Sequence, residues 1–511
     1  MITSPRKSLD AVRLDVASAG LRRSLGPIQL ILIGVGCIVG AGVYVMTGTA
    51  SASYAGPAVI VSFFVAALAC GFTALCYAEL ASVLPVSGAS YTYAYAALGE
   101  LWAWALAWML MLEFGLAGSA LAVGFSGYLQ SLLRDFGILL PEAIGHSTLV
   151  ATQAARGGTS FSLSGSVDLP ALLALGAVSA VLVRGVRQSA AINTLLVSLK
   201  IGVLLLFVLV GLPHVESANW TPFVPPSEGG FHYGWPGVLR GASVVFFAYL
   251  GFEVVATASS EARRPQRDVP IGILGALAIS TLIYAAVAAV LTGLVPFRTL
   301  GVADPIALAV GAVGLPVLAV IVKAGALTGL GSVLLVNTYG QSRICFAMAR
   351  DGLLPAAFHR LHSRHATPAV GTVIVAGISA VAAATLPIAL LADLVSIGTA
   401  FVFCVVAIAT MWMRTRHPDL ERPFSVPFGG RLVGGVWIGT VPALALVLCL
   451  AMMAPVLADL ALRAIGGDWI PATLLAVYIV AGGLLYLRYG YRHSAVRNGA
   501  TAVSNRASGD V

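Results

Sequence analysis

Twelve long apolar runs dominate the sequence and leave few folds open to it. A run of about 20 apolar residues can cross the hydrocarbon core of a bilayer as a helix. Only 10% of the residues are charged, whereas soluble domains carry roughly 25%. The sequence therefore predicts an all-α integral membrane protein with twelve transmembrane helices. The runs lie near 28–50, 57–81, 101–129, 168–184, 190–212, 237–259, 270–295, 306–337, 368–386, 389–412, 434–458 and 469–488.

The lysines and arginines are divided unevenly between the two sides of this predicted membrane. With both termini on one side, that side holds 22 of the 29 basic residues, and the opposite side holds four. Because basic loops stay in the cytoplasm, we expect a multi-pass protein of the cytoplasmic (inner) membrane with both termini inside. The net charge of +8 is then a topology signal, and it gives no reason to expect a nucleic-acid partner.

The predicted loops divide the chain without leaving room for a soluble domain. The Gly/Ser-rich stretch 152–166 predicts a flexible loop, and 338–367 predicts a short amphipathic helix at the membrane face. All six cysteines lie within or beside apolar helices, which is typical of packing residues and not of disulfides. The expected units are the N-terminus 1–27, two five-helix halves 28–212 and 213–412, helices 11 and 12 over 413–488, and the tail 489–511.

Two of the predicted helices contain glycines at positions that invite a break, a cluster of four in the first and Gly251, flanked by aromatic residues, in the sixth. The first contains GVGCIVGAGVYV (Gly34–Val45), and the sixth contains FFAYLGFEVVATASSEA (Phe246–Ala262). Each glycine inside a helix costs about 1 kcal/mol relative to alanine. These helices occupy matching positions in the two halves, and because five is odd the halves would cross in opposite senses. Glycine-interrupted helices at matching positions of an inverted repeat point to a binding site at mid-membrane.

An interrupted helix exposes main-chain polar groups that a ligand can bind. The half-helix that begins after Gly40, Ala41 and Gly42 offers N–H donors and a positive dipole end to a carboxylate. Carbonyl groups freed between Ala248 and Gly251 suit an ammonium group. Together they match a zwitterionic α-amino acid. The alternative is that the glycines only let helices pack closely.

The remaining three basic residues, Lys200, Arg240 and Lys323, lie inside predicted spans, as do several carboxylates, and three of these charges are candidates for function. Lys200 sits near the middle of helix 5, about 15 Å from either end at 1.5 Å per residue. Burial disfavours the charged form of a lysine, so Lys200 is a candidate for proton exchange. Glu113, in helix 3, is the expected counterion of Lys200 or of a basic substrate, and Glu253 is expected at the substrate or at a closing gate. The alternatives are a permanent structural salt bridge for Lys200, a purely structural role for Glu113 and a role away from the substrate for Glu253.

Other ionisable residues are expected to have ordinary roles. Glu79 and Asp393 lie at helix ends, where interfacial water can solvate them, and no partner of Lys323 is evident. The histidines of HRLHSRH (359–365) have no carboxylate or thiolate cluster beside them, so we expect no metal site. No protease, nucleophile-elbow or phosphate-loop motif occurs, which argues against an enzyme.

Four separated motifs resemble the amino acid–polyamine–organocation superfamily. They are GCIVGAGVYV, FFAYLGFEVVATASSEARRPQRDVPIGI, SRICFAMARDGLLP, and LVSIGTAFVFCVVAIATMWMRTRHPDLERPFSVP at 394–427. The last is similar to the cationic amino acid transporter branch. The resemblance covers roughly residues 28–490. It implies the LeuT-type fold, a five-plus-five inverted repeat with two further helices and with helices 1 and 6 broken.

The resemblance also implies roles for individual residues. The substrate carboxylate is expected at Ile38, Gly40, Ala41 and Gly42, and its amino group at Phe247, Ala248, Leu250 and Gly251. Glu113 and Glu253 are expected near the substrate, and Lys200 with Glu113 in proton coupling. Members of this branch often carry Asp where this chain has Glu253, which changes the reach of that carboxylate.

The expected function is proton-coupled symport of cationic or small neutral L-amino acids, driven by the proton gradient without a cofactor. The expected partners are the substrate and the lipid bilayer, and a small single-span subunit remains open. An exchanger or facilitator, a polyamine carrier and a non-transporting nutrient sensor are the alternatives.

Overall fold

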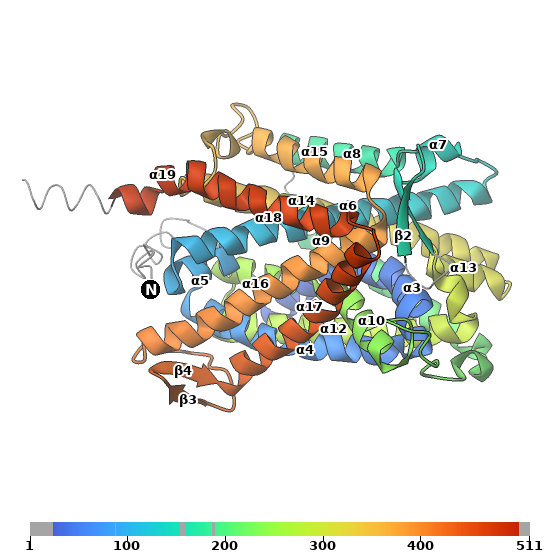
Figure 1. Ribbon diagram of the computed structural model, residues 1–511, viewed down its shortest axis with the longest axis horizontal. Helices are drawn as coiled ribbons and strands as arrows, with labels where there is room; N and C mark the ends of the chain where they lie inside the picture. The colour runs from blue at the N-terminus through green and yellow to red at the C-terminus, as the bar shows by residue number, and fades with distance from the viewer. Residues whose placement is uncertain (1–23, 87, 154–158, 186–189, 500–511) are drawn as a thin grey trace, which may run out of the picture.

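The computed structural model describes residues 24–86, 88–153, 159–185 and 190–499 (Figure 1). The α-helices are α2 (Pro27–Ile38), α3 (Thr47–Ala50), α4 (Val59–Val83), α5 (Ala89–Ala97), α6 (Glu100–Asp135), α7 (Glu142–Gly145), α8 (Leu169–Arg184), α9 (Ala190–Gly211), α10 (Gly234–Phe246), α11 (Val254–Thr257), α12 (Pro265–Leu294), α13 (Pro305–Ala312), α14 (Pro316–Arg350), α15 (Ala369–Thr385), α16 (Ile388–Arg416), α17 (Thr440–Ile465), α18 (Ile470–Leu485) and α19 (Tyr491–His493).

Tighter and wider helical turns and two hairpins complete the described chain. The π-helical segments are η1 (Gly42–Met46), η2 (Ser51–Ala55) and η10 (Tyr486–Gly490). The 3₁₀ segments are η3 (Gly56–Ala58), η4 (Leu212–His214), η5 (Ser217–Trp220), η6 (Phe247–Tyr249), η7 (Ala258–Glu261), η8 (Phe297–Leu300) and η9 (Ala356–Phe358). The strands are β1 (Leu149–Gln153), antiparallel to β2 (Thr159–Leu163), and β3 (Gly430–Val433), antiparallel to β4 (Val436–Gly439).

The helices agree with the predicted apolar runs. Nine helical stretches of the described residues are long and apolar enough to cross a membrane, and three shorter apolar helices (α2, α8 and α15) accompany them. Together they cover all twelve runs. A helix pairs its backbone polar groups internally, as a hydrocarbon environment requires. The chain is therefore an all-α membrane protein.

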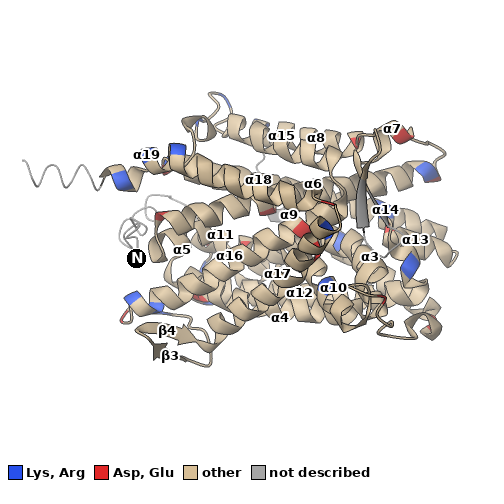
Figure 2. Cartoon of the chain, viewed as in Figure 1, with Lys and Arg blue, Asp and Glu red and all other residues tan. Residues whose placement is uncertain are grey.

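The helix bundle has two ends. Figure 1 shows α5, the β3–β4 hairpin and α19 at one end, which we call the α19 end, and α7, β2 and α13 at the other, which we call the α13 end. Charged residues gather toward these ends and are sparse between them (Figure 2). The core lies among α4, α6, α10, α12 and α16, where the Phe403 ring contacts those of Phe246 and Phe252 (centroids 5.6 and 5.2 Å apart).

Two loop predictions are wrong. The amphipathic helix expected over 338–367 does not form, because α14 continues through the first part of this stretch to Arg350. Its polar residues Thr338, Gln341 and Ser342 are buried, and α14 packs against α6 and α15. In the stretch 152–166, expected to be a flexible loop, residues 154–158 lie outside the described residues, whereas the described part includes β2 and the end of β1.

Candidate functional site

The first glycine-rich helix is interrupted where predicted. α2 ends at Ile38, Val39 leaves helical geometry (ψ 94°), and regular helical structure resumes at η1. The first backbone hydrogen bond after the interruption runs from the Tyr44 amide to the Gly40 carbonyl (3.3 Å). The amides before Tyr44 stand at a helix start, where N–H groups have no partner in their own helix and the dipole is positive.

The sixth predicted helix is interrupted as well. α10 ends at Phe246, η6 adds one tight turn, and Leu250 is extended (ψ 133°). Gly251 follows with φ +117°, a conformation that residues with a side chain rarely adopt, and α11 begins three residues later. The carbonyl groups of this turn are thus turned away from a regular helical ladder.

The two interruptions lie against each other. A Cβ added to Gly42 would lie 2.3 Å from the Ala248 Cα, and one added to Gly251 would lie 2.8 Å from the Cys37 Cβ. Main chain therefore meets main chain, so the glycines permit close packing as well as the interruptions. The eight residues predicted for the substrate backbone all lie at or beside this contact and are buried: Ile38, Gly40, Ala41, Gly42, Phe247, Ala248, Leu250 and Gly251.

Tyr284 of α12 bridges the two interruptions, and the sequence analysis did not identify it. Its hydroxyl lies 2.8 Å from the Ile38 carbonyl oxygen and 3.0 Å from that of Ala248. One hydroxyl hydrogen is shared between these two acceptors. An ammonium group, with three hydrogens, would satisfy both acceptors at once. No motif marks a tyrosine on an apolar helix as a site residue.

Lys200 of α9 binds the end of α2. Its ammonium group donates to the carbonyl of Gly36 and, at 3.1 Å, to that of Val39. The side chain is 1% exposed. A cation at a helix C-terminus satisfies carbonyls that lack intrahelical partners and interacts favourably with the helix dipole. Lys200 therefore fixes the position at which the first interruption begins.

The predicted pairing of Glu113 with Lys200 is wrong. Among the described residues Glu113 has no cationic partner: its side chain is fully buried, and the only side-chain group that interacts with its carboxylate as a hydrogen-bond donor is the Thr399 hydroxyl, outside good hydrogen-bond geometry. Glu113 packs beside Gly398 and Thr399 of α16, whereas Lys200 packs beside Gly329 of α14. The Lys200 ammonium instead binds the main-chain carbonyls of Gly36 and Val39 at the end of α2.

Glu253 lies at the second interruption and near Glu113. One carboxylate oxygen accepts a hydrogen bond from the Gly251 amide (3.0 Å), and the other has no partner among the described residues. The two carboxylates interact electrostatically with each other. A buried unpartnered carboxylate is costly, so this pair suits a site that a proton or a cationic ligand group occupies during function.

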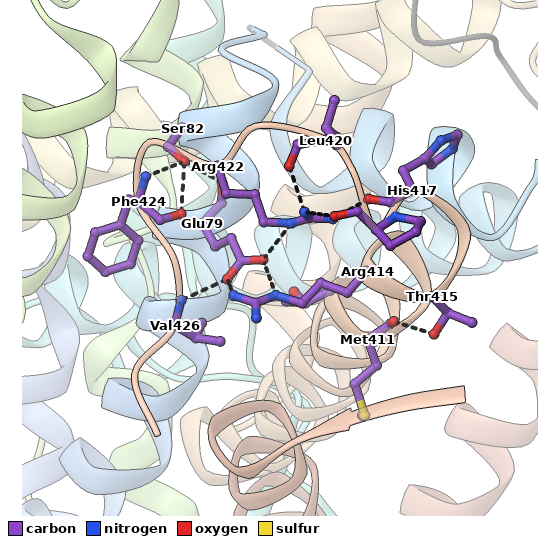
Figure 3. Close-up of polar contacts among 12 residues, drawn as sticks. Glu79, Ser82, Met411, Arg414, Thr415, His417, Leu420, Arg422, Phe424 and Val426 are labelled. Atoms are coloured by element: carbon purple, nitrogen blue, oxygen red, sulfur yellow. Dashed lines mark hydrogen bonds and ion pairs between the residues drawn. The ribbon is translucent and has the colours of Figure 1, made fainter. Parts of the chain in front are cut away.

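Glu79 at the α19 end of α4 is buried, contrary to the expectation of interfacial solvation. Its carboxylate receives two hydrogen bonds from Arg414 of α16 (2.7 and 2.6 Å) and one from the Val426 amide (2.7 Å). The Arg422 Nε lies 3.6 Å away. Figure 3 shows these groups converging on the carboxylate between α4, α16 and the loop that follows α16.

Asp393 is likewise buried and paired. Arg240 of α10 contacts Asp393 of α16 (2.8 Å) and Asp459 of α17 (3.1 Å), and Arg463 also binds Asp459 (2.6 Å). The sequence had also left Lys323 of α14 without a partner. It forms an ion pair of 2.6 Å with Asp135 at the end of α6.

Comparison with known proteins shows a family match along nearly the whole chain. Residues 25–482 match the family model described as amino acid permease. The chain belongs to the amino acid permease family. It is 39% identical over 490 residues to the methylthioribose transporter of Bacillus subtilis (strain 168), covering 96% of this chain and 98% of the relative. The branched-chain amino acid permease BcaP of that organism is 39% identical over 491 residues, with the same coverage.

A plant relative confirms the resemblance to cationic amino acid transporters. The vacuolar cationic amino acid transporter 4 of Arabidopsis thaliana is 37% identical over 419 residues, which cover 81% of this chain and 67% of the relative. The permease family and its transporter relatives also agree with the expectation that the chain is a transporter and not an enzyme. Among the described residues no group of three or more His, Cys, Asp or Glu could hold a metal ion.

Proposed function

We propose that this permease is a secondary transporter that binds an L-amino acid between its two interrupted helices. One observation carries the proposal: the helix start at Gly40 and the carbonyl groups of Ile38 and Ala248 lie together, with the Tyr284 hydroxyl between those carbonyls. The helix start suits a carboxylate, and the two carbonyls suit an ammonium group. The substrate amine would replace the hydroxyl of Tyr284.

The proposed architecture is a five-plus-five inverted repeat with two further helices. Interruptions in the first and sixth apolar runs support it, because matching breaks are typical of inverted repeats. We propose that the protein lies in the cytoplasmic membrane with its α19 end facing the cytoplasm. The excess of Lys and Arg on one side supports this orientation.

We propose that proton coupling involves two residues that lie apart, Lys200 at the end of α2 and Glu113 near the second interruption. A protonated Lys200 holds the end of α2 through Gly36 and Val39, and losing its charge would weaken that attachment. A proton on Glu113 would remove an unpartnered buried charge. The first event would change the gate, and the second would change the electrostatics near the substrate.

Uptake into proteoliposomes tests the proposal. The wild-type protein is expected to accumulate an amino acid only with an imposed proton gradient, and Lys200→Ala is expected to abolish gradient-driven uptake while the protein remains folded. Lys323→Ala is the matched control, because that lysine pairs with Asp135 away from the interruptions. Unchanged gradient-driven uptake by folded Lys200→Ala would overturn the coupling role, and trans-stimulation without any need for a gradient would favour an exchanger.

The substrate side chain needs a separate test. We propose cationic or small neutral amino acids, with Glu113 and Glu253 as the groups that would favour a cationic one. A thermal-shift panel of common amino acids, methylthioribose and a polyamine on purified protein addresses this, since a ligand bound to the folded state raises its melting temperature. Because one relative is a methylthioribose transporter, a response to methylthioribose alone would overturn the amino acid assignment.

A further inference from the structure

Residues 494–498, which follow α19, dock onto the body of the protein at the α19 end. Ser494 is fully buried, and its hydroxyl donates to the Glu100 carboxylate at the start of α6. The Arg497 guanidinium reaches the same carboxylate (3.2 Å). The Ala495 amide donates to the Asp351 carbonyl just after α14 (3.0 Å). We call this stretch the docked segment.

The surface that receives the docked segment is closely fitted to it. Glu100 is fully buried and also accepts hydrogen bonds from the hydroxyls of Tyr486 (2.9 Å) and Tyr95 (3.4 Å). Gly352 has φ +79°, and a Cβ there would lie 2.1 Å from the His493 carbonyl oxygen. A buried carboxylate with four donors, and a close backbone approach that needs glycine, distinguish this contact from a tail lying loosely on a surface.

The docked segment shares its partners with α5. Tyr95 of α5 contacts Glu100, and Tyr91 of α5 donates to the Asp351 carboxylate (2.7 Å). The docked segment binds the same two acidic residues, one through its carboxylate and the other through its backbone carbonyl. Docking and the position of α5 are therefore linked through Glu100 and Asp351.

α5 in turn contacts the wall of the second interruption. Ser90 at its start is hydrogen-bonded to the Tyr77 hydroxyl of α4 (2.7 Å). The Tyr77 ring packs edge-on against Phe252 (centroids 5.7 Å apart), the residue between Gly251 and Glu253. Hydrogen bonds and ring contacts thus connect the docked segment through α5 to the second interruption.

We infer that the docked segment is a latch that holds the α19 end of the permease closed. Docked, it fixes α5 and, through Tyr77, keeps the second interruption against Cys37 of α2. Released, it frees α5 and lets the halves of the interrupted helices separate at this end. The inference rests on the proposed transport function for its effect on uptake, but the effect on the accessibility of Cys37 does not depend on transport.

Two truncations of the full chain test the latch. Deletion of 500–511 keeps the docked segment and is the matched control, and deletion of 494–511 removes it. The readout is the rate at which N-ethylmaleimide alkylates Cys37, measured by peptide mass spectrometry. We expect deletion of 494–511 to speed alkylation at least about tenfold, because it removes two hydrogen bonds to the Glu100 carboxylate and the loss of even one charge-assisted hydrogen bond shifts an equilibrium by roughly that factor. The control truncation should leave the rate unchanged.

Other results of this experiment would overturn either the latch or the proposed function. Equal alkylation of Cys37 in the two folded truncations would overturn the latch. If deletion of 494–511 prevents folding, the Ser494→Ala/Arg497→Ala double variant is judged in the same way against Arg492→Ala, since Arg492 does not contact Glu100 in the described structure. A protein that transports nothing, yet shows faster alkylation on truncation, would overturn the proposed function and leave the latch standing.

Discussion

Gly42 and Gly251 each meet a requirement that no larger residue can meet. At Gly42 the neighbouring group is backbone, the Ala248 Cα, so a clash cannot be relieved by turning a side chain. At Gly251 the positive φ adds a conformational requirement. Both glycines lie at the contact between the interruptions, so a substitution there acts on the proposed site directly.

Gly42→Ala is expected to abolish uptake and to destabilise the protein by about 1–3 kcal/mol, as overpacking does. Thermal unfolding and uptake assays measure the two effects. The control is Gly377→Ala on an exposed face of α15, where a Cβ would meet nothing within 4 Å. Normal uptake by Gly42→Ala would contradict the close approach of the interruptions.

Tyr284→Phe tests whether the hydroxyl occupies the place of the substrate amine. The empty protein would lose the partner of two buried carbonyls, which costs about 1–3 kcal/mol, whereas bound substrate would supply its own donor. The rise in melting temperature on adding substrate should therefore be larger than in the wild type. Tyr249→Phe, whose hydroxyl binds the Phe63 carbonyl (3.0 Å), should lower the melting temperature equally with and without substrate.

These residues also show what the sequence could and could not predict. The glycine cluster of the first apolar run and Gly251 in the sixth indicated the two interruptions, because glycine weakens the interior of a helix. The pairing of Lys200 with Glu113 was wrong because charge and depth in the membrane do not reveal that main-chain carbonyls at the end of α2 bind the ammonium. Tyr284 was missed because a single tyrosine in an apolar helix resembles an ordinary core residue.

At the scale of elements, α16 is held near both ends by buried ion pairs. Asp393 pairs with Arg240 of α10 near its start, and Arg414 pairs with Glu79 of α4 near its end. Sequence analysis had placed both acids in interfacial water, because their partners are distant in the chain and only the packed bundle brings them together. Breaking a buried pair leaves an uncompensated charge, which is why such pairs are costly to disrupt.

Arg414→Met is expected to destabilise the protein by about 3–5 kcal/mol, since it strands the Glu79 carboxylate. Adding Glu79→Gln should restore much of that loss, because it removes the stranded charge. Arg298→Met is the comparison. Arg298 pairs with Glu228, but the Arg298 side chain is more than half exposed, and exposed ion pairs contribute little to stability. Detergent thermal unfolding measures all three, and equal losses in Arg414→Met and Arg298→Met would refute the argument.

At the scale of the whole molecule, the apolar runs predicted nearly every long helix, because a hydrocarbon environment forces backbone polar groups into internal pairs. The main error is at residues 338–350, where the expected surface helix is instead the continuation of a buried helix. α14 leaves the apolar run but remains packed against α6 and α15, so buried polar residues such as Gln341 continue a helix that hydropathy alone would end.

The orientation of the molecule gives a further prediction. With 22 basic residues on the side of the termini against four on the other, a C-terminal green fluorescent protein fusion should fluoresce and an alkaline phosphatase fusion should be inactive. A fusion placed between α6 and α7 should show the reverse pattern, because α7 lies at the α13 end. Active phosphatase at the C-terminus would place the α19 end outside.

The meeting of Gly42 with Ala248 has a consequence for how such a protein can diversify. Under the proposed function, the atoms that would grip the shared head group of the cargo belong to the peptide backbone, which mutation cannot exchange for other chemistry. Surrounding side chains such as that of Glu113 can be substituted while these main-chain contacts stay the same. A lineage built in this way could adopt new cargoes by altering the periphery while keeping the same anchor.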